Sequence, residues 1–369
     1  TTQEVGIGYR YLKEAMNERA SQLALVDNVP TVRPGSDGHT YQDRTGGTEA
    51  SAFYIDDKID VGNWTITPGI RFEKIDSDWR DRPVLGLNGK PVQEKKRSKD
   101  YNEPLPALSL MYHLSDEWKL FANYSESFGS LQYFQLGQGG SGNDTAAGLE
   151  PEKAKTYELG TRYDNGSWGG EITLFYIDFD DELQYVSNDV GWTNLGATKH
   201  QGIETSGHYD FAALDPRLDG LSVYGSLTYT RATYEGDIPS FKGRDLPLYS
   251  RQVATAGVRY EVDRWTYNLD AFAQSMQRAP GLSTDSQGNF THNYITEPSA
   301  DGQYGDIPGY VTWNARVGYD FGPQASNLKL GLGVKNLFDK QYFTRSSDNN
   351  SGIYVGQPRT LFMQASVGF

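Results

Sequence analysis

The feature that most constrains the fold is a period of two in side-chain polarity, which recurs along the chain. In the last nine residues, apolar side chains at Leu361, Met363, Ala365, Val367 and Phe369 alternate with small or polar ones at Gln364, Ser366 and Gly368. Side chains of a strand point alternately to its two faces, so this stretch is predicted to be a strand with one dry and one wet face. The same alternation runs through 221–230, 265–274, 311–321 and 328–335. A chain of such strands needs an apolar environment on one side and a polar one on the other.

Composition limits the classes of protein that can use this pattern. The mean hydropathy of the 369 residues is -0.63, and no apolar run approaches the ~18 residues that a membrane-spanning helix needs. A barrel strand needs only about 9–11 residues with alternate positions apolar, so a membrane β-barrel remains compatible with this low value. The chain has no cysteine, which excludes a disulfide framework and a thiolate metal site. Its net charge of -14 argues against a nucleic-acid partner.

Short turns alternate with long polar loops, and about 14 strands are expected from the pattern. The first strand is expected near Val5–Lys13, followed by a loop over about Glu14–Gly46. Later hairpins turn at Val61–Asn63, Ser115–Glu117 and Asp164–Ser167, again separated by long loops such as 75–102 and 129–152. Most connections in compact soluble domains are short, whereas outer-membrane barrels alternate short turns with long loops. The predicted fold is therefore all-β, a transmembrane antiparallel β-barrel.

The two faces of these strands separate a barrel from a soluble β-sandwich, which is the alternative with the same alternation. The wet face carries charged residues that would be costly in a sandwich core but suit a polar lumen. The dry face carries aromatic residues, several of them at strand ends beside short turns, where a membrane barrel places an aromatic girdle. The charged set is Asp270, Arg316, Asp320, Lys329 and Lys335, and the aromatic set is Trp64, Trp118, Trp265, Tyr267, Trp313, Tyr319 and Phe369.

Four segments resemble signatures of the TonB-dependent outer-membrane receptors. They are LEPEKAKTYELG at 149–160, VKNLFDKQY at 334–342, GQPRT at 356–360 and the terminal Phe369. Within this family the resemblance is closest to the receptors for ferric dicitrate, and it runs along nearly the whole chain. Examples are GYRYL at 8–12, DDKID at 56–60 and GNWTITPG at 62–69.

The resemblance implies the architecture and the partners of the whole protein. Family members carry an N-terminal plug with a TonB box before a 22-stranded barrel, so residues 1–369 are expected to be the C-terminal part of the barrel, without the plug and the first strands. The implied location is the bacterial outer membrane, as a monomer in contact with lipid and lipopolysaccharide. The implied function is transport of ferric dicitrate energised by TonB, with Phe369 as an assembly signal. No enzymatic activity and no resident cofactor are expected, because iron(III) arrives as substrate in its citrate chelate.

The expected binding site lies in the long loops and uses cations and amides, because guanidinium groups pair bidentately with carboxylates such as those of citrate. The resemblance aligns Arg44 and Asn349 with residues of the family's citrate-binding set. A glutamine of that set aligns on Ser187, which reaches less far. Gln184 or Asn188 is therefore expected to replace the missing contact.

Two further ligand candidates, and alternative roles for two residues of this set, stay open. Arg345 and Arg33 are additional candidate cations in the loops. Arg44 could instead pair with Asp43, and Asn349 could stabilise its own turn through the backbone.

Other charged and titratable groups leave alternatives open. The run Lys95–Lys99 is expected to be solvated or to face lipopolysaccharide. An acidic cluster could hold a divalent cation or form a wet strand end; it comprises Asp178, Asp180, Asp181 and Glu182. The five histidines form no H-E-x-x-H spacing, although His39 and His292 lie in long loops and keep a haem receptor open. The remaining alternatives are a receptor for another siderophore, a passive porin-like channel and a soluble β-sandwich binding protein.

Overall fold

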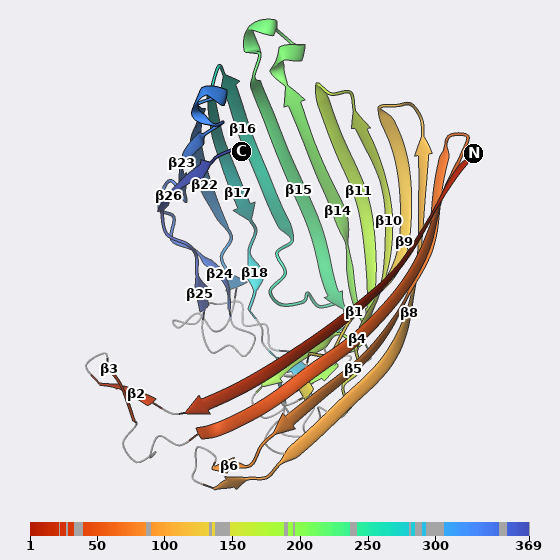
Figure 1. Cartoon of the computed structure of the whole chain (residues 1–369), viewed down its shortest axis with the longest axis vertical. Coiled ribbons are helices and arrows are strands. Elements are labelled where there is room, and N and C mark those ends of the chain that lie inside the picture. Colours follow the sequence, from red (N-terminus) through yellow and green to blue (C-terminus); the bar gives the residue numbers. More distant parts are fainter. Residues whose placement is uncertain are drawn as a thin grey trace.

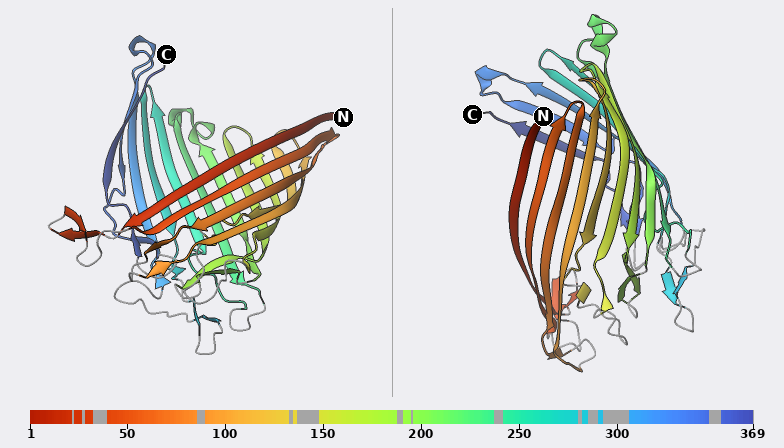
Figure 2. Two further views of the ribbon diagram at one scale, coloured as in Figure 1. Left: turned by 60° about the horizontal axis from the view of Figure 1, so that its bottom comes forward. Right: turned by 90° about the vertical axis from the view of Figure 1, so that its right-hand side faces the viewer.

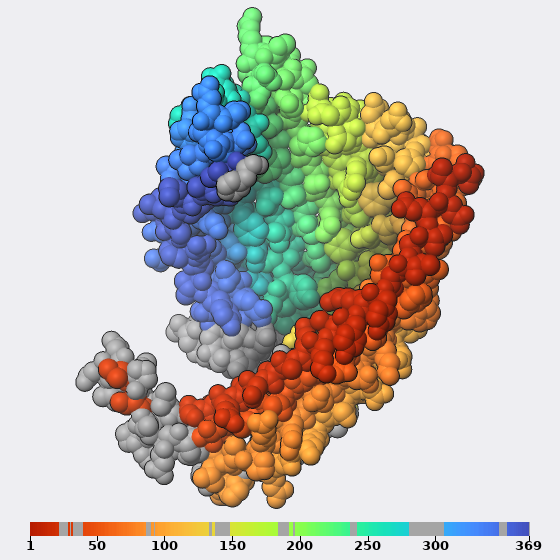
Figure 3. Space-filling model, in the orientation of Figure 1, coloured from red at the N-terminus to blue at the C-terminus, as the bar shows by residue number. Residues whose placement is uncertain are grey.

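The computed structural model shows the chain as one large curved β-sheet with short hairpins at one end (Figure 1). Space-filling atoms of the same view show this sheet as a continuous curved wall (Figure 3). The residues that the structure describes are 1–21, 23–26, 29–32, 40–85, 90–132, 135–136, 148–187, 191–194, 196–236, 242–279, 282–284, 290–292, 306–346 and 353–368.

The described residues form a sheet of fourteen strands, each antiparallel to its neighbours and arranged in chain order from β1 to β26. This confirms the predicted all-β antiparallel fold and its strand number. No described helix is long and apolar enough to cross a membrane. The strands are β1 Thr2–Ser21, β4 Thr40–Val61, β5 Trp64–Asp81, β8 Lys95–His113, β9 Trp118–Gly129, β10 Glu152–Asp164, β11 Trp168–Asp180, β14 Thr198–Asp210, β15 Leu221–Tyr234, β16 Gln252–Val262, β17 Trp265–Gln274, β22 Tyr310–Asp320, β23 Lys329–Lys335 and β26 Thr360–Ser366.

The two ends of the sheet differ in their connections. At the turn end, tight turns use residues with positive φ, such as Gly62 at 58° and Gly166 at 87°, a conformation that favours glycine. Three short 3₁₀ helices also lie at this end: η2 Phe211–Ala213, η3 Pro216–Leu218 and η4 Pro323–Ala325. Among the described residues, the loop end carries six two-stranded antiparallel pairs: β2 Leu23–Val26 with β3 Val29–Val32, β6 Val84–Leu85 with β7 Pro91–Val92, β12 Leu183–Ser187 with β13 Gly191–Asn194, β18 Gln277–Arg278 with β21 Asp306–Ile307, β19 Leu282–Thr284 with β20 Phe290–His292, and β24 Phe343–Ser346 with β25 Ile353–Val355.

The outer face of the sheet carries the dry side chains. Trp64, Trp118, Trp168 and Trp265 each begin a strand directly after a tight turn, and all four are exposed. Trp64, Trp118 and Trp265 belong to the predicted aromatic girdle, where indole rings meet the lipid headgroups, and Trp168 adds a fourth tryptophan at the turn end. The inner face is polar, as predicted; for example, Asp270 accepts hydrogen bonds from Asn268 and Asn314.

Four strands are much longer than the rest. Strands β1, β4, β5 and β8 have 18 to 22 residues, whereas β9, β10, β11, β14, β15, β16, β17 and β22 have 10 to 14. We call these four strands the long-strand wall; in Figure 2 they project past the other strands at the loop end. At the loop end, the wall separates from β9. Strand β8 pairs with β9 only over Ala107–His113, whereas it pairs with β5 over Lys95–Tyr112.

The wall corrects two sequence predictions. The expected loop Glu14–Gly46 is occupied by the ends of β1 and β4, and the run Lys95–Lys99 begins strand β8 instead of lying in a loop. Both faces of these segments are polar, because they extend past the apolar band. A strand without an apolar face has no period of two in hydrophobicity. The predicted strands therefore stopped where the apolar band ends.

Candidate functional site

The inner face of the long-strand wall collects cations at the loop end. On β5, Ile75, Ser77 and Trp79 are buried, while the residues between them are exposed, which identifies the face that carries Trp79 as the inner one. Strand register then groups inner residues into rows about 6.6 Å apart along the strands. From the rim inward, the rows are Glu18, Arg44, Asp81 and Lys95; Met16, Gly46, Trp79 and Arg97; and Glu14, Thr48, Ser77 and Lys99.

Arg44 lies in the outermost inner row and is held by two neighbours. Its Nε atom is 2.9 Å from Oδ1 of Asp81 on the adjacent strand, and its guanidinium carbon is 5.4 Å from the ring centroid of Trp79. The sequence-based alternative, a pair with Asp43, is wrong because successive residues point to opposite faces. The ion pair uses only Nε, and the two terminal nitrogens carry four further N–H donors.

Trp79 forms the floor beneath Arg44. It is 1% exposed and packs with Leu131, Leu136 and Leu149 from the β9–β10 connection, against which Met16, Leu183 and Trp192 also pack. We call this group the Trp79 cluster. It joins the long-strand wall to the β9–β10 connection and to the β12–β13 hairpin.

Two further cations, Arg97 and Lys99, lie in the next two inner rows towards the apolar band. Neither was predicted as a ligand from the sequence. Nη1 of Arg97 donates to the carbonyl oxygen of Leu136 at 2.5 Å, and Nζ of Lys99 lies 2.7 Å from a carboxylate oxygen of Glu150. The available signal was the period of two that Arg97 and Lys99 share with Tyr101 further along β8. Together with Arg44, they make three cations on the inner wall, in rows that also hold the carboxylates of Glu14, Glu18 and Asp81.

The β12–β13 hairpin is anchored at its root to the segment that precedes β10. Oε1 of Glu152 accepts a hydrogen bond of 2.6 Å from the backbone N–H of Leu183. The side-chain amide of Asn194 donates to the carbonyls of Glu150 and Asp181 at 2.9 and 2.5 Å and accepts from the N–H of Glu150 at 2.9 Å. Two connections are thus fixed to each other by side chains that bind backbone groups.

Burial changes the titration of groups around this root. Burial raises the pKa of Glu152, which lies past the apolar band; the N–H of Leu183 opposes this effect and the charge of Glu182 adds to it. Burial and the same two carboxylates raise the pKa of Tyr249 to about 12. The imidazole of His200 lies between the rings of Phe179 and Tyr249, with centroids 5.0 and 4.9 Å away.

The acidic cluster does not gather as a metal site. Glu182 instead binds the hydroxyl of Thr198 and faces His200, while Asp180 lies 3.9 Å from Lys155. Among the described residues, no group of three or more potential ligands is arranged to hold a metal ion. Strand alternation and separate hydrogen-bond partners keep these carboxylates apart.

The other predicted ligand residues are distributed around the loop end. Gln184 and Ser187 lie on β12, on the hairpin whose root meets the Trp79 cluster. Arg345 is exposed on β24, where its Nε donates to the carbonyl of Ser346 at 3.1 Å; β24 lies below β23 and β26, away from the long-strand wall (Figure 1). The structure therefore brings Arg44 and the β12 hairpin to one cluster, and it places Arg345 at another side of the lumen. The residues that lie outside the described part of the chain are Asn188, Asn349, Phe369, Arg33 and His39.

Comparisons with known proteins give one family. Residues 2–337 match the family model described as "TonB dependent receptor-like, beta-barrel". The solved structure of the ferric citrate transporter FecA in the unliganded form is 43% identical, with a TM-score of 0.77, over 99% of this chain and 51% of that chain. The metal-pseudopaline receptor CntO of Pseudomonas aeruginosa is 25% identical over 87% of this chain and 41% of its own length.

A third comparison supports the fold alone. The ferric-catecholate import receptor Fiu from K12 E. coli, in its closed form, is 21% identical with a TM-score of 0.73, over all of this chain and 52% of that chain. The chain spans about half the length of the relatives that it matches, or somewhat less.

Proposed function

The chain belongs to the TonB-dependent receptor family and forms part of the β-barrel of an outer-membrane protein. We propose that this protein is an active transporter of ferric dicitrate. The observation that carries this proposal is the set of inner-wall cations Arg44, Arg97 and Lys99, in a chain 43% identical to a ferric citrate transporter. The barrel is a scaffold in this function and does no chemistry on the iron.

Recognition begins at Arg44. Its terminal nitrogens match the two oxygens of a carboxylate, and Asp81 and Trp79 fix the plane of the guanidinium before the anion arrives. A guanidinium held in place loses less side-chain entropy on binding than a solvated one. Arg44 is therefore the first anchor for a citrate carboxylate.

Arg97 and Lys99 supply the second contact. Each is occupied by an oxygen of the β9–β10 connection, namely the carbonyl of Leu136 and the carboxylate of Glu150. An incoming carboxylate offers the same acceptor chemistry with more charge. Exchange of these partners would couple anion binding to a rearrangement of that connection.

The hairpin β12–β13 forms the opposing side of the site. It carries Gln184 and Ser187, with Asn188 next in sequence, and its root is fixed to the β9–β10 connection through Asn194 and Glu152. Arg345 on β24 and, further along the sequence, Asn349 complete the predicted set. In this arrangement, amides and a hydroxyl bind citrate oxygens that the cations leave free.

The partners of the whole protein follow the family. A plug carrying a TonB box would fill the lumen, and TonB would remodel it to release the chelate inward, with the receptor acting as a monomer. Iron(III) is cargo in its citrate chelate, so no resident cofactor is required.

The test measures binding of ferric citrate to the full-length receptor, with iron-free citrate, a ferric catecholate and a ferric hydroxamate as competitors. Arg44→Ala with Asn349→Ala is expected to weaken ferric citrate binding at least tenfold. Arg80→Ala, at the same height on the outer face, is the matched control and should leave the affinity unchanged. Unchanged affinity in the double variant would refute the site, and a preference for another chelate would refute the substrate.

A further inference from the structure

The outer face of the long-strand wall changes character with distance from the apolar band. The last apolar row is Tyr9, Phe53, Phe72 and Pro104. Two rows further out, the row Lys13, Glu49, Asp76 and Asp100 is dominated by carboxylates. Beyond these, the outermost positions are Asn17, Thr45, Arg80 and Lys96, followed by Arg19, Asp43, Arg82 and Glu94. The outermost two rows carry four cations and two carboxylates.

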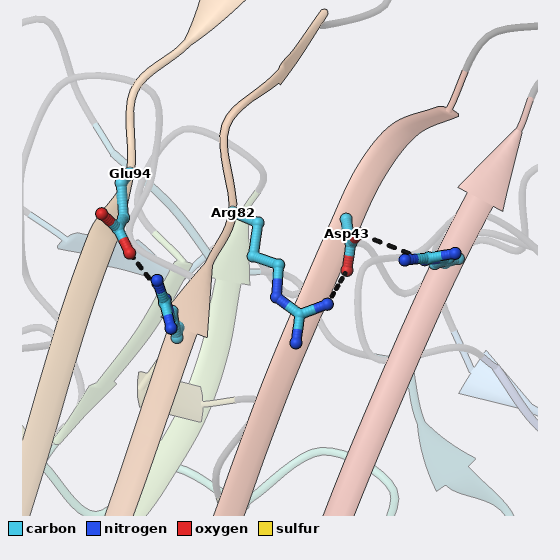
Figure 4. A network of polar contacts seen from close by, with 5 residues as sticks. Asp43, Arg82 and Glu94 are labelled. Carbon is cyan, nitrogen blue, oxygen red and sulfur yellow. Dashed lines mark hydrogen bonds and ion pairs between the residues drawn. The ribbon is translucent and has the colours of Figure 1, made fainter.

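The four cations form two triads, each centred on one carboxylate. Figure 4 labels Asp43 and Arg82 of the first triad and Glu94 of the second. Asp43 lies between Arg19 at 3.1 Å and Arg82 at 3.2 Å. Glu94 lies between Arg80 at 2.6 Å and Lys96 at 3.5 Å. Each triad therefore keeps one positive charge in excess.

The acids are less exposed than the bases that flank them. The side chains of Asp43 and Glu94 are 12% and 35% exposed, whereas those of Arg19 and Lys96 are 67% and 65% exposed. A ligand that approaches from outside meets guanidinium and ammonium N–H groups from β1, from β5 and its end, and from β8, with β4 between β1 and β5. The carboxylates of Asp43 and Glu94 hold these groups in place. This cationic surface is unusual for a chain whose net charge is -14.

The height of the cationic surface indicates which anion it can reach. Phe72 and Arg80 are eight residues apart on β5, about 26 Å along the strand or about 19 Å above the apolar band at a typical tilt near 45°. The headgroup layer adds only about 5–7 Å on each side of the hydrocarbon core. The surface thus lies above the layer in which lipid-anchor phosphates reside, and the carboxylate row with Glu49, Asp76 and Asp100 lies nearer to that layer.

We propose that Arg19, Arg80, Arg82 and Lys96 bind phosphate groups carried on the saccharide of an outer-leaflet glycolipid. Arginine forks match phosphate oxygens bidentately, and three arginines and a lysine spread across the four strands of the wall suit a ligand with more than one phosphate. Asn17 and Thr45, in the same row as Arg80, offer an amide and a hydroxyl to sugar hydroxyls. The carboxylate row below disfavours the anchor phosphates of the same molecule.

This surface also refines the expectation for the run Lys95–Lys99. Only Lys96 and Ser98 of the run point outward, whereas Lys95, Arg97 and Lys99 share the inner face with Trp79. One short basic segment thus serves two anions on opposite sides of the wall. The proposal depends on the outer-membrane location of the chain and not on the identity of the chelate.

The experiment uses the full-length receptor in detergent and measures its apparent Kd for three probes. They are a glycolipid with a phosphorylated core saccharide, the same glycolipid without the saccharide phosphates, and inorganic phosphate. The first probe is expected to bind at least tenfold more tightly than the other two. Equal binding of the unphosphorylated glycolipid, or of inorganic phosphate alone, would overturn the assignment.

Variants separate charge from folding. The quadruple variant Arg19→Gln, Arg80→Gln, Arg82→Gln and Lys96→Gln should lose at least tenfold in glycolipid affinity while ferric citrate affinity stays unchanged. Lys13→Gln with Lys74→Gln, in the lower rows, is the matched control and should change glycolipid affinity less than twofold. Because loss of the cations could loosen the wall, a second variant keeps them: Asp43→Asn with Glu94→Gln should bind the phosphorylated glycolipid as tightly or more tightly. Wild-type glycolipid affinity in the quadruple variant, or weaker binding in this second variant, would contradict the proposal.

Discussion

The long-strand wall and the short strands that end the sheet use the same alternation for different purposes. Strands β23 and β26 have seven residues each, and their outer side chains face lipid almost throughout; Leu361, for example, is 79% exposed. Strand β5 has 18 residues, of which the first half suffices to cross a membrane. The surplus length of the wall carries Arg44, Trp79 and Arg97 inside and the cationic surface outside. Membrane crossing thus fixes the length of the short strands, whereas the extra length of the long ones carries the residues that we propose to bind anions.

The largest test of this comparison removes a tryptophan from each region. Trp79→Ala opens a cavity in the Trp79 cluster and removes the floor of Arg44, so we expect a local loss of about 3–5 kcal/mol and ferric citrate binding weakened well beyond tenfold. Trp265→Ala, in the girdle of β17, should cost about 1 kcal/mol or less and leave the affinity unchanged. Chelate titration and denaturant unfolding measure both effects, and equal losses of affinity would remove the distinction between the regions.

A second test compares two arginines of the inner face. Arg44→Lys keeps a cation beside Asp81 but loses the planar fork, so affinity for ferric citrate should fall about tenfold. Arg44→Ala should cost about 2–3 kcal/mol of binding, because Asp81 is also left unpaired. Arg316→Lys, in the short-strand region where Arg316 donates to Gln364, is the control and should bind normally. A normal affinity of Arg44→Lys for ferric citrate would show that binding depends on the charge at this position and not on the guanidinium geometry.

A third test addresses what holds the short strands in register. The ring of Phe362 lies flat over Gly333, where a Cβ would meet ring atoms at 2.2 Å, whereas a Cβ at Gly318 would meet only ordinary contacts near 3.8 Å. Gly333→Ala should therefore lower the free energy of unfolding by about 1–2 kcal/mol, and Gly318→Ala by less. Thermal unfolding in detergent measures the difference. Equal stabilities would show that the ring can move at little cost.

The smallest expected effect is a pH dependence at the root of the β12–β13 hairpin. The pKa of Glu152 is raised by burial in the folded protein, so its contribution to stability is complete below the unfolded value of about 4.5 and is lost as pH rises through the folded value. Hydrogen exchange of the Leu183 amide, corrected for its intrinsic rate, should show more protection at mildly acidic pH than at neutral pH. Glu152→Gln keeps an acceptor for that amide and should abolish the dependence. Persistence of the pH effect in this variant would assign it to a group other than Glu152.

The sequence allowed the fold to be predicted wherever one strand face is dry. The strands around Trp265 and Leu332 were placed correctly, since lipid on one side enforces the period of two. The pattern failed at Lys95–Lys99 and at Glu14–Gly46, where water lies on both sides and nothing in hydrophobicity marks a strand.

The site was only partly predictable for a different reason. Arg44 was expected in a loop but lies on strand β4, and its role as a ligand stays a prediction. Its partner depends on which residue of β5 lies opposite, and register is set by pairing over the whole hairpin. Arg97 was missed because its row becomes visible only when β8 is aligned with Trp79. Asn349, Asn188 and Phe369 stay predictions.

The seam between β8 and β9 has a consequence for how such a protein can vary. Beyond Ala107 towards the loop end, β8 and β9 are no longer paired. The segment around Leu131 fills the space between them, and the backbone N–H of Leu131 donates to the hydroxyl of Tyr101. Insertions or deletions in the loop-end part of the wall therefore need no matching change in β9. Recognition surfaces on both sides of the wall could diversify over generations while the circumference of the barrel and its contact with lipid stay the same.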